Sequence, residues 1–341
     1  MTKKLTIILS FALVLTLLAG CMGRVVVFNE CDCSGDTYVP AEGALKTGLA
    51  IVANAKDSVD ATEAKYDITI AAVTVDDGGV IQDCIIDSVG TSITFDDKGA
   101  ITSDLNAQIL TKNELGDNYG MKAYGGAKYE WYEQAAALAN YAKGKTVAEL
   151  KNGAVGESGK PTDADLASSA TIYLGGYVAA IEEAVANAKH LGAQAGDTLK
   201  LAVINSAASS VSATADKAGT AQLDCDVAVV TAKDGVITSC LLDSVQAKVS
   251  FGTDGKITTD LTAAMQTKNQ LGEAYGMKAY AGAKYEWHEQ AANFAAYVTG
   301  KTAQQVAGIA VAEGKPSDTD LAATVTIAIG GFQALIAKAM G

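Results

Sequence analysis

A string of 24 residues occurs twice in this chain, and this repetition constrains the fold more than any other feature of the sequence. Thr111–Gln134 and Thr267–Gln290 are identical at 19 of 24 positions. The same offset pairs GVIQDCIIDSV with GVITSCLLDSV and, with one residue deleted, GKPTDADLASSATI with GKPSDTDLAATVTI. A unit of about 150 residues is too long for a solenoid repeat and has the size of a whole domain. The sequence therefore predicts two tandem duplicated domains.

The first unit changes from strand-like to helix-like patterning along its length. YDITIAAVTV alternates, the Gly-bearing turn Asp76–Gly79 follows, and VIQDCIIDSV comes next, which predicts a strand, a hairpin and a strand. A second, shorter hairpin is expected around Asp97–Gly99. Apolar residues then recur at a helical period from about Met121 to Ala142 and from Asp163 to about Ala188, the latter with Asp163 or Asp165 as N-cap. This order predicts the α+β class, with an antiparallel sheet and helices packed on one face.

The first segment has the features of a bacterial lipoprotein signal. Lys3 and Lys4 precede an apolar run that ends at Leu18, and Leu-Ala-Gly-Cys follows, ending at Cys21. The run is shorter than the roughly 20 apolar residues of a spanning helix. We expect Cys21 to be lipidated and the mature chain to be held at the extracytoplasmic face of the cell membrane. An ordinary secreted protein with a chance cysteine is the alternative.

These features give the expected organisation and charge of the chain. Residues 1–20 are the signal peptide, 21–43 a lipidated tether that contains Cys31 and Cys33, 44–190 the first domain and 191–341 the second. Loss of the two lysines of the signal changes the formal net charge from −13 to −15. Lys and Arg do not cluster, so nucleic acid is not an expected partner.

Several catalytic and metal-binding devices are excluded by the residues themselves. The two histidines, His190 and His288, stand at unmatched positions, so a duplicated Ser-His-Asp or Cys-His device is absent. No His and Cys cluster predicts a metal site. Cys84 and Cys240 occupy equivalent strand positions and are expected in the core. The pairing of Cys31, Cys33 and Cys225 stays open.

The order of motifs in each unit resembles the FMN-binding domain family. The resemblance is carried by DGGVIQDCIIDSV, TKNELGDNYGM, GKT and DADLASSATIYLGGYVAAIEEA. The family supplies subunits of membrane ion-pumping reductases and flavin lipoproteins of extracellular electron transfer. In it, the last hydroxyl of an Asp-x-x-Ser/Thr-Gly-Ala-Thr/Ser motif is esterified to the FMN phosphate. The resemblance implies a lipoprotein that relays electrons from a membrane donor to an extracellular acceptor, and thus a carrier more than an enzyme with its own substrate.

The resemblance also implies which residues hold the cofactor. Thr171 becomes the FMN acceptor of the first unit, where Ser169 replaces the motif's Gly, and Thr326 becomes that of the second, which keeps fewer motif residues. In the loop motif, Leu-Gly is kept in both units, whereas the preceding Pro-Gly is Asn-Glu or Asn-Gln. The remaining matched residues are Asp165, Ser168, Ala170, Asp320, Leu115, Gly116, Leu271 and Gly272.

Two interpretations of these residues remain open. Thr171 either brings a phosphate to a helix N-terminus, where free N–H groups and the helix dipole favour it, or is one of several first-turn hydroxyls of a packed helix. The aromatic residues either stack on the isoalloxazine ring or form core, which their helical spacing favours. The functional alternative is a flavin-free surface ligand-binding or structural lipoprotein of the same fold. The aromatic residues are Tyr124, Tyr129, Trp131, Tyr280, Tyr285 and Trp287.

Overall fold

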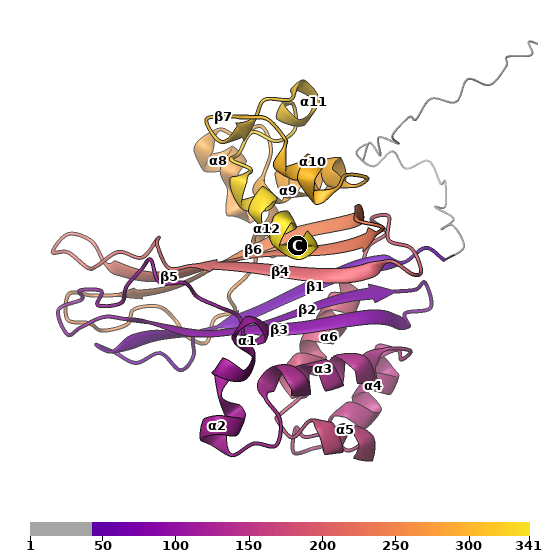
Figure 1. Ribbon diagram of the computed structural model, residues 1–341. Coiled ribbons are helices and arrows are strands. Elements are labelled where there is room, and N and C mark those ends of the chain that lie inside the picture. The colour runs from indigo at the N-terminus through magenta and orange to yellow at the C-terminus, as the bar shows by residue number, and fades with distance from the viewer. Residues whose placement is uncertain (1–42) are drawn as a thin grey trace, which may run out of the picture. The chain divides into compact units, whose positions relative to one another are not determined.

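The computed structural model describes residues 43–341, and this part of the chain is α+β (Figure 1). It contains two three-stranded antiparallel sheets, each with its strands in sequence order. The first consists of β1 (Lys46–Asn54), β2 (Glu63–Val75) and β3 (Ile81–Thr94), and the second of β4 (Thr198–Ser206), β5 (Gly219–Lys233) and β6 (Val236–Phe251). A short ribbon pairs β7 (Val311–Ala312) with β8 (Lys315–Pro316). The predicted fold class is confirmed.

Each sheet is followed in the chain by a similar series of helices. After β3 come α1 (Lys112–Leu115), the 3₁₀-helix η1 (Gly116–Tyr119), α2 (Met121–Gly125), α3 (Trp131–Ala142), α4 (Val147–Ala154), α5 (Ala164–Ser169) and α6 (Gly175–Ala186). After β6 come α7 (Lys268–Leu271), η2 (Gly272–Tyr275), α8 (Met277–Ala281), α9 (Trp287–Val298), α10 (Ala303–Ala307), α11 (Thr319–Ala322) and α12 (Gly330–Met340). None of the described helices has the length and apolarity to span a membrane.

The predicted hairpin of the first sheet forms around an aspartate. Asp76 Oδ1 accepts the Val80 N–H at 2.9 Å, and Gly79 has φ 78°, a conformation that costs glycine little. The shorter hairpin forms too, because the Asp96 N–H bonds the Ala100 carbonyl at 2.9 Å. These turns set the register in which Val73 lies opposite Cys84.

Alternation along the strands sends apolar residues to both faces of each sheet. In β2, Ile68 and Ile70 pack in a cluster that also holds Val227 and Val229 of β5, whereas Ala71 and Val73 pack against the helices of the first half. The Phe95 and Phe251 rings stack at 4.0 Å in the shared cluster. A third cluster joins the second sheet to α9 and α12. Helices therefore cover one face of each sheet, as predicted.

The predicted lengths of the two long helices in the first half are wrong, because each helix is interrupted in the structure. Gly126, with φ 63°, ends α2, and Tyr129 and Glu130 lead into a separate α3. The predicted helix over 163–188 breaks after α5, because Ala170 is extended and the next two N–H groups bond the side chain of Gln134. Thr171 consequently lies between two helices and not in a first turn.

Candidate functional site

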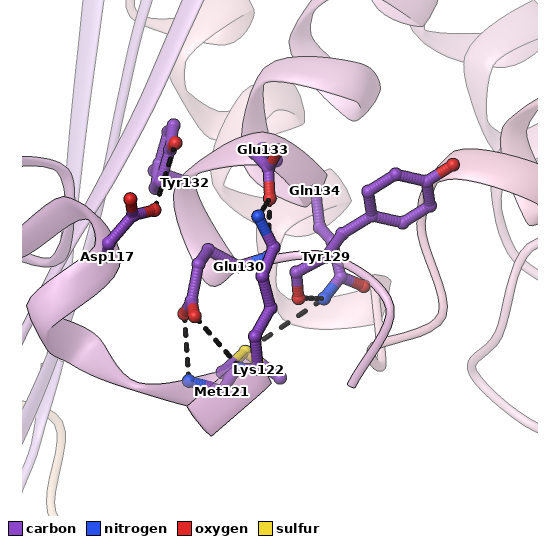
Figure 2. Close-up of polar contacts among 8 residues, drawn as sticks. All are labelled: Asp117, Met121, Lys122, Tyr129, Glu130, Tyr132, Glu133 and Gln134. Carbon is purple, nitrogen blue, oxygen red and sulfur yellow. Dashed lines mark hydrogen bonds and ion pairs between the residues drawn. The ribbon is translucent and has the colours of Figure 1, made fainter. Parts of the chain in front are cut away.

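Glu130, at the centre of the repeated string, is a structural carboxylate. It is 1% exposed, and its two oxygens accept the N–H groups of Met121 and Lys122 at 2.8 and 2.9 Å (Figure 2). The Glu130 N–H in turn donates to Glu133 at 2.7 Å, which completes a capping box at the start of α3. Glu286 repeats these contacts. The string thus joins α2 to α3, and its buried acid is fully engaged.

Gln134, four residues further on, anchors the threonine expected to carry the cofactor. Its side chain is fully buried, and Oε1 accepts the Thr171 N–H at 2.7 Å, the Thr171 hydroxyl at 3.2 Å and the Ile172 N–H at 3.1 Å. Its Nε2 donates to the Tyr129 carbonyl at 3.0 Å (Figure 2). Three hydrogen atoms therefore converge on one buried oxygen.

The second half repeats this arrangement. Gln290 Oε1 accepts from Thr326 N, Thr326 Oγ1 and Ile327 N at 2.7, 3.1 and 3.2 Å. Both acceptor threonines are nevertheless exposed to solvent. The structure thus holds each hydroxyl by a buried partner at an accessible surface position.

An uncapped helix begins four residues after each threonine. Leu174, the N-cap of α6, offers no side-chain bond, and Gly175 and Gly176 open the helix. A side-chain carbon added to either glycine would meet no atom within 4 Å, and neither has a positive φ. Gly330 and Gly331 repeat this at α12. Neither packing nor backbone conformation therefore requires these glycines. The free N–H groups at the start of such a helix are suited to bind a phosphate.

Asp165, Ser168 and Ser169 of the attachment motif lie in α5. Asp163, and not Asp165, caps this helix by accepting the N–H groups of Asp165 and Leu166 at 3.0 Å. The Ser168 and Ser169 hydroxyls donate back to carbonyls of the same helix, Ser168 to Asp165 at 2.8 Å and Ser169 to Leu166 at 3.1 Å. These two hydroxyls therefore bond to the backbone of their own helix.

The remaining attachment residues follow the same plan in both halves. Ala170 is fully buried where α5 ends. In the second half Asp318, and not Asp320, caps α11, with its Oδ1 accepting the Leu321 N–H at 3.0 Å. Asp165 and Asp320 both lie exposed within their helices, so of the two N-caps expected in the first half it is Asp163 that has the role.

The Leu-Gly motif forms a turn that needs glycine. Gly116 has φ 51° and ψ −126°, and Gly272 has φ 53° and ψ −123°, a combination that L side chains rarely adopt. Leu115 and Leu271, half-buried, precede these glycines. Asp117, after the turn, accepts the Tyr132 hydroxyl of α3 at 3.3 Å (Figure 2). Helix α3 therefore contacts the loop motif through Tyr132 and the acceptor threonine through Gln134.

The repeated aromatic residues divide between core and surface. Trp131 and Trp287 are 2% and 7% exposed, and Trp131 donates to the Tyr177 hydroxyl at 2.9 Å. The core interpretation is correct for them. It is wrong for Tyr124 and Tyr280, which are 92% and 91% exposed. Tyr129 and Tyr285 are half-buried.

The sequence did not predict a lysine in each half that packs against aromatic rings, buried in the first half and half-buried in the second. Lys112 is 9% exposed, with its Nζ 5.2 Å from the Tyr119 ring centre and 5.3 Å from that of Trp131. Lys268 lies in the same way between Tyr275 and Trp287, and burial lowers the pKa of its ammonium group. The repetition of a Lys beside an aromatic helix start was visible in the string, but a lysine next to a capping Thr is ordinarily solvated.

Two buried aspartates bond to the short helices that begin with these lysines. Asp87 and Asp243 are 6% and 8% exposed, and each accepts a helix N–H, from Asn113 of α1 and Asn269 of α7 respectively, at 3.1 Å. Burial raises the pKa of both carboxyls, that of Asp243 to about 6. A hollow of about 250 Å³ lies beside Asp87, and one of about 160 Å³ beside Cys84. Both are smaller than the roughly 300 Å³ at which pockets begin to enclose drug-sized ligands.

The cysteines and acidic groups offer no redox or metal centre in the described part of the chain. Cys84, Cys225 and Cys240 are free and buried, and burial raises the pKa of Cys84 and of Cys240 to about 12. Such thiols are inert. No group of three or more His, Cys, Asp or Glu side chains within residues 43–341 is placed to hold a metal ion. Cys21, Cys31 and Cys33 lie outside the described residues.

Comparisons with known proteins give little information about this site. No family model matches the chain, and no solved structure matches it. A chlorophenol reductase from Desulfitobacterium hafniense is 35% identical over 127 residues. The match covers 33% of this chain and only 38% of that protein.

Proposed function

We propose that this protein is a lipid-anchored extracytoplasmic carrier of covalently bound FMN, which relays electrons from a membrane donor to an extracellular acceptor. The observation that carries the proposal is the pair of exposed threonines, Thr171 and Thr326, each held by a buried glutamine and each followed by an open Gly-Gly helix start. The motif resemblance predicts FMN at these same two hydroxyls.

The residues around Thr171 fit an FMN held at the surface. The Thr171 oxygen would carry the phosphate, and the N–H groups of Gly175 and Gly176 would face it at the start of α6. Tyr173, 69% exposed, offers a ring face two residues away, and the Lys160 ammonium lies 5.4 Å from its centre. Bound FMN would supply the ability to accept and release electrons, which the described side chains lack.

A covalent bond is what such a surface site needs. The described hollows are smaller than a flavin pocket, so FMN would bury little apolar area against this protein. Retention would then depend on the phosphoester, and the exposed ring would be open to redox partners. Because the match to the chlorophenol reductase covers so little of either chain, its substrate is not assigned to this protein.

The two halves differ in what surrounds the threonine. Ala328 stands where the first half has Tyr173, so the second half lacks the exposed ring, although Lys315 corresponds to Lys160. We therefore propose fuller use of Thr171 than of Thr326. The flavin-free alternative is favoured by one feature, namely the replacement of the motif's Gly by Ser169 and Thr324.

Intact mass and absorbance test the proposal. The full-length lipoprotein is co-expressed with a flavin transferase, and the expected product is yellow and carries one or two FMN adducts. Thr171→Ala should remove the adduct of the first half, Thr326→Ala that of the second, and the double variant both, with unchanged circular dichroism. Cys21→Ser should release the protein from the membrane fraction without changing the adducts. An unmodified wild-type protein that also fails to bind free FMN would refute the flavin function and leave the flavin-free alternative.

A further inference from the structure

The orientation of the Gln134 amide is fixed by its surroundings. Two backbone N–H groups, from Thr171 and Ile172, point at one terminal atom, which must therefore be the acceptor oxygen. The other terminal atom lies 3.0 Å from the Tyr129 carbonyl, so it must be the donating nitrogen. The same reasoning fixes Gln290 through Thr326, Ile327 and Tyr285. The assignment thus rests on three neighbouring groups and holds independently in both halves.

This orientation dictates where the threonine hydroxyl points. Gln134 Oε1 can accept but not donate, so the Thr171 hydroxyl at 3.2 Å must direct its hydrogen inward. The lone pairs of Thr171 Oγ1 consequently face away from Gln134, on a residue exposed to solvent. A lone pair is the part of a hydroxyl that attacks phosphorus. The buried amide therefore presents the nucleophilic side of the hydroxyl outward.

The backbone bonds add a second constraint. A threonine in an irregular segment otherwise has several χ1 rotamers and a mobile backbone. Here the N–H groups of Thr171 and Ile172 bond the same fully buried side chain, which α3 carries. Gln134 thus limits both the position of the threonine and the direction of its hydroxyl. Phosphoryl transfer depends chiefly on such positioning, since its transition state is loose.

We infer that Gln134 and Gln290 are positioning residues for esterification of Thr171 and Thr326, an inference that rests on the proposed function. The phosphoester requires FMN activated as a phosphoanhydride, as in flavin adenine dinucleotide. The Thr171 Oγ1–P bond forms, the anhydride P–O bond breaks, adenosine monophosphate leaves, and the hydroxyl proton passes to a base of the transferase. No electrons are transferred in this step. The ester oxygen no longer donates to Gln134, but both backbone bonds persist.

The test measures esterification at one threonine at a time. In a Thr326→Ala background, purified protein is incubated with flavin adenine dinucleotide, Mg²⁺ and a flavin transferase, and the adduct is followed by intact mass. Gln134→Leu removes the acceptor at nearly constant volume, and Gln134→Glu keeps an oxygen that accepts the same three hydrogens. Gln290→Leu is the matched control, because it makes the identical loss in the half without an acceptor threonine. Circular dichroism at the assay temperature verifies that each variant is folded.

The expected result is a fall in kcat for Gln134→Leu on the order of 10- to 100-fold, with an unchanged KM for the protein substrate. Gln134→Glu should restore most of the rate, and Gln290→Leu should match the background. A merely structural role would raise KM or leave Gln134→Glu as slow as Gln134→Leu, and either outcome overturns the inference, as does an unchanged kcat in Gln134→Leu. Absence of any adduct on the Thr326→Ala background itself would instead refute the proposed function at Thr171.

Discussion

Replacement of Asp243 by Asn should make the protein more stable above pH 6. The carboxyl is 8% exposed, and burial raises its pKa from 3.8 to about 6. Between these two pH values the unfolded chain has lost a proton that the folded chain retains. The free energy of unfolding therefore falls as the pH rises through this window, by about 1.4 kcal/mol per unit and about 3 kcal/mol in total.

An asparagine keeps the two backbone bonds to Oδ1 but not the charge. Asp243 Oδ1 accepts the N–H groups of Ser244 and Asn269 at 2.7 and 3.1 Å, and an amide oxygen accepts both. Lys268 lies close enough to favour the carboxylate, and the pKa of about 6 already includes this effect. Asp87 is unchanged in the variant and contributes in the same direction to both proteins.

Urea denaturation at about pH 4.5 and about pH 7.5 measures this effect. The free energy of unfolding of Asp243→Asn, relative to wild type, should rise by about 1–3 kcal/mol between the two pH values. Asp254→Asn is the control, because Asp254 is exposed and backbone N–H bonds lower the pKa of its carboxyl. The argument is refuted if Asp243→Asn has the same pH dependence as wild type, or is the less stable protein at pH 7.5.

Two further predictions concern the repeated string and the helix start. Glu130→Gln should lower the free energy of unfolding, measured by urea denaturation, by about 1–3 kcal/mol. The reason is that an amide nitrogen cannot accept one of the two N–H groups at Met121 and Lys122. Equal stability of variant and wild type would mean that these bonds do not stabilise α2. Gly176→Ala should leave the melting temperature unchanged or raise it, since an added carbon meets no atom, but should reduce FMN adduct at Thr171 if the phosphate approaches this turn. The same substitution at Gly331 is its matched control, and unaltered adduct in Gly176→Ala would place the phosphate elsewhere.

The strands that the sequence predicted are those with a turn residue beside them. Asp76 and Gly79 mark the β2–β3 hairpin, and the alternation of Ile68 and Ile70 with polar neighbours gives its period. Strand β1 was not predicted, because Leu49 to Val52 is a short apolar run that fits a buried helix segment equally well. Its pairing with β2 is fixed by partners far along the chain.

The breaks in the two predicted helices depend on contacts that no local pattern contains. The residues 163–188 are apolar at a helical period throughout, yet α5 ends at Ser169. The competing interaction is the amide of Gln134, which takes the N–H groups of Thr171 and Ile172 from 37 and 38 residues away. A helical period predicts which residues face the core. It does not show that a side-chain oxygen from another helix accepts the N–H groups that helix carbonyls would otherwise accept.

Buried residues of the repeated string have two different roles. Glu130 and Trp131 are buried and bond to other helices, Glu130 to α2 and Trp131 to Tyr177 of α6, so a substitution of either residue should affect the fold. Gln134 is equally buried, but the groups that it holds lie at the surface. If the chain required only a helix break, the two backbone N–H bonds would provide it. The additional bond to the hydroxyl, made at Thr171 and again at Thr326, restricts the rotation of an exposed side chain. This restriction costs side-chain entropy, and the packing of the helix break does not require it.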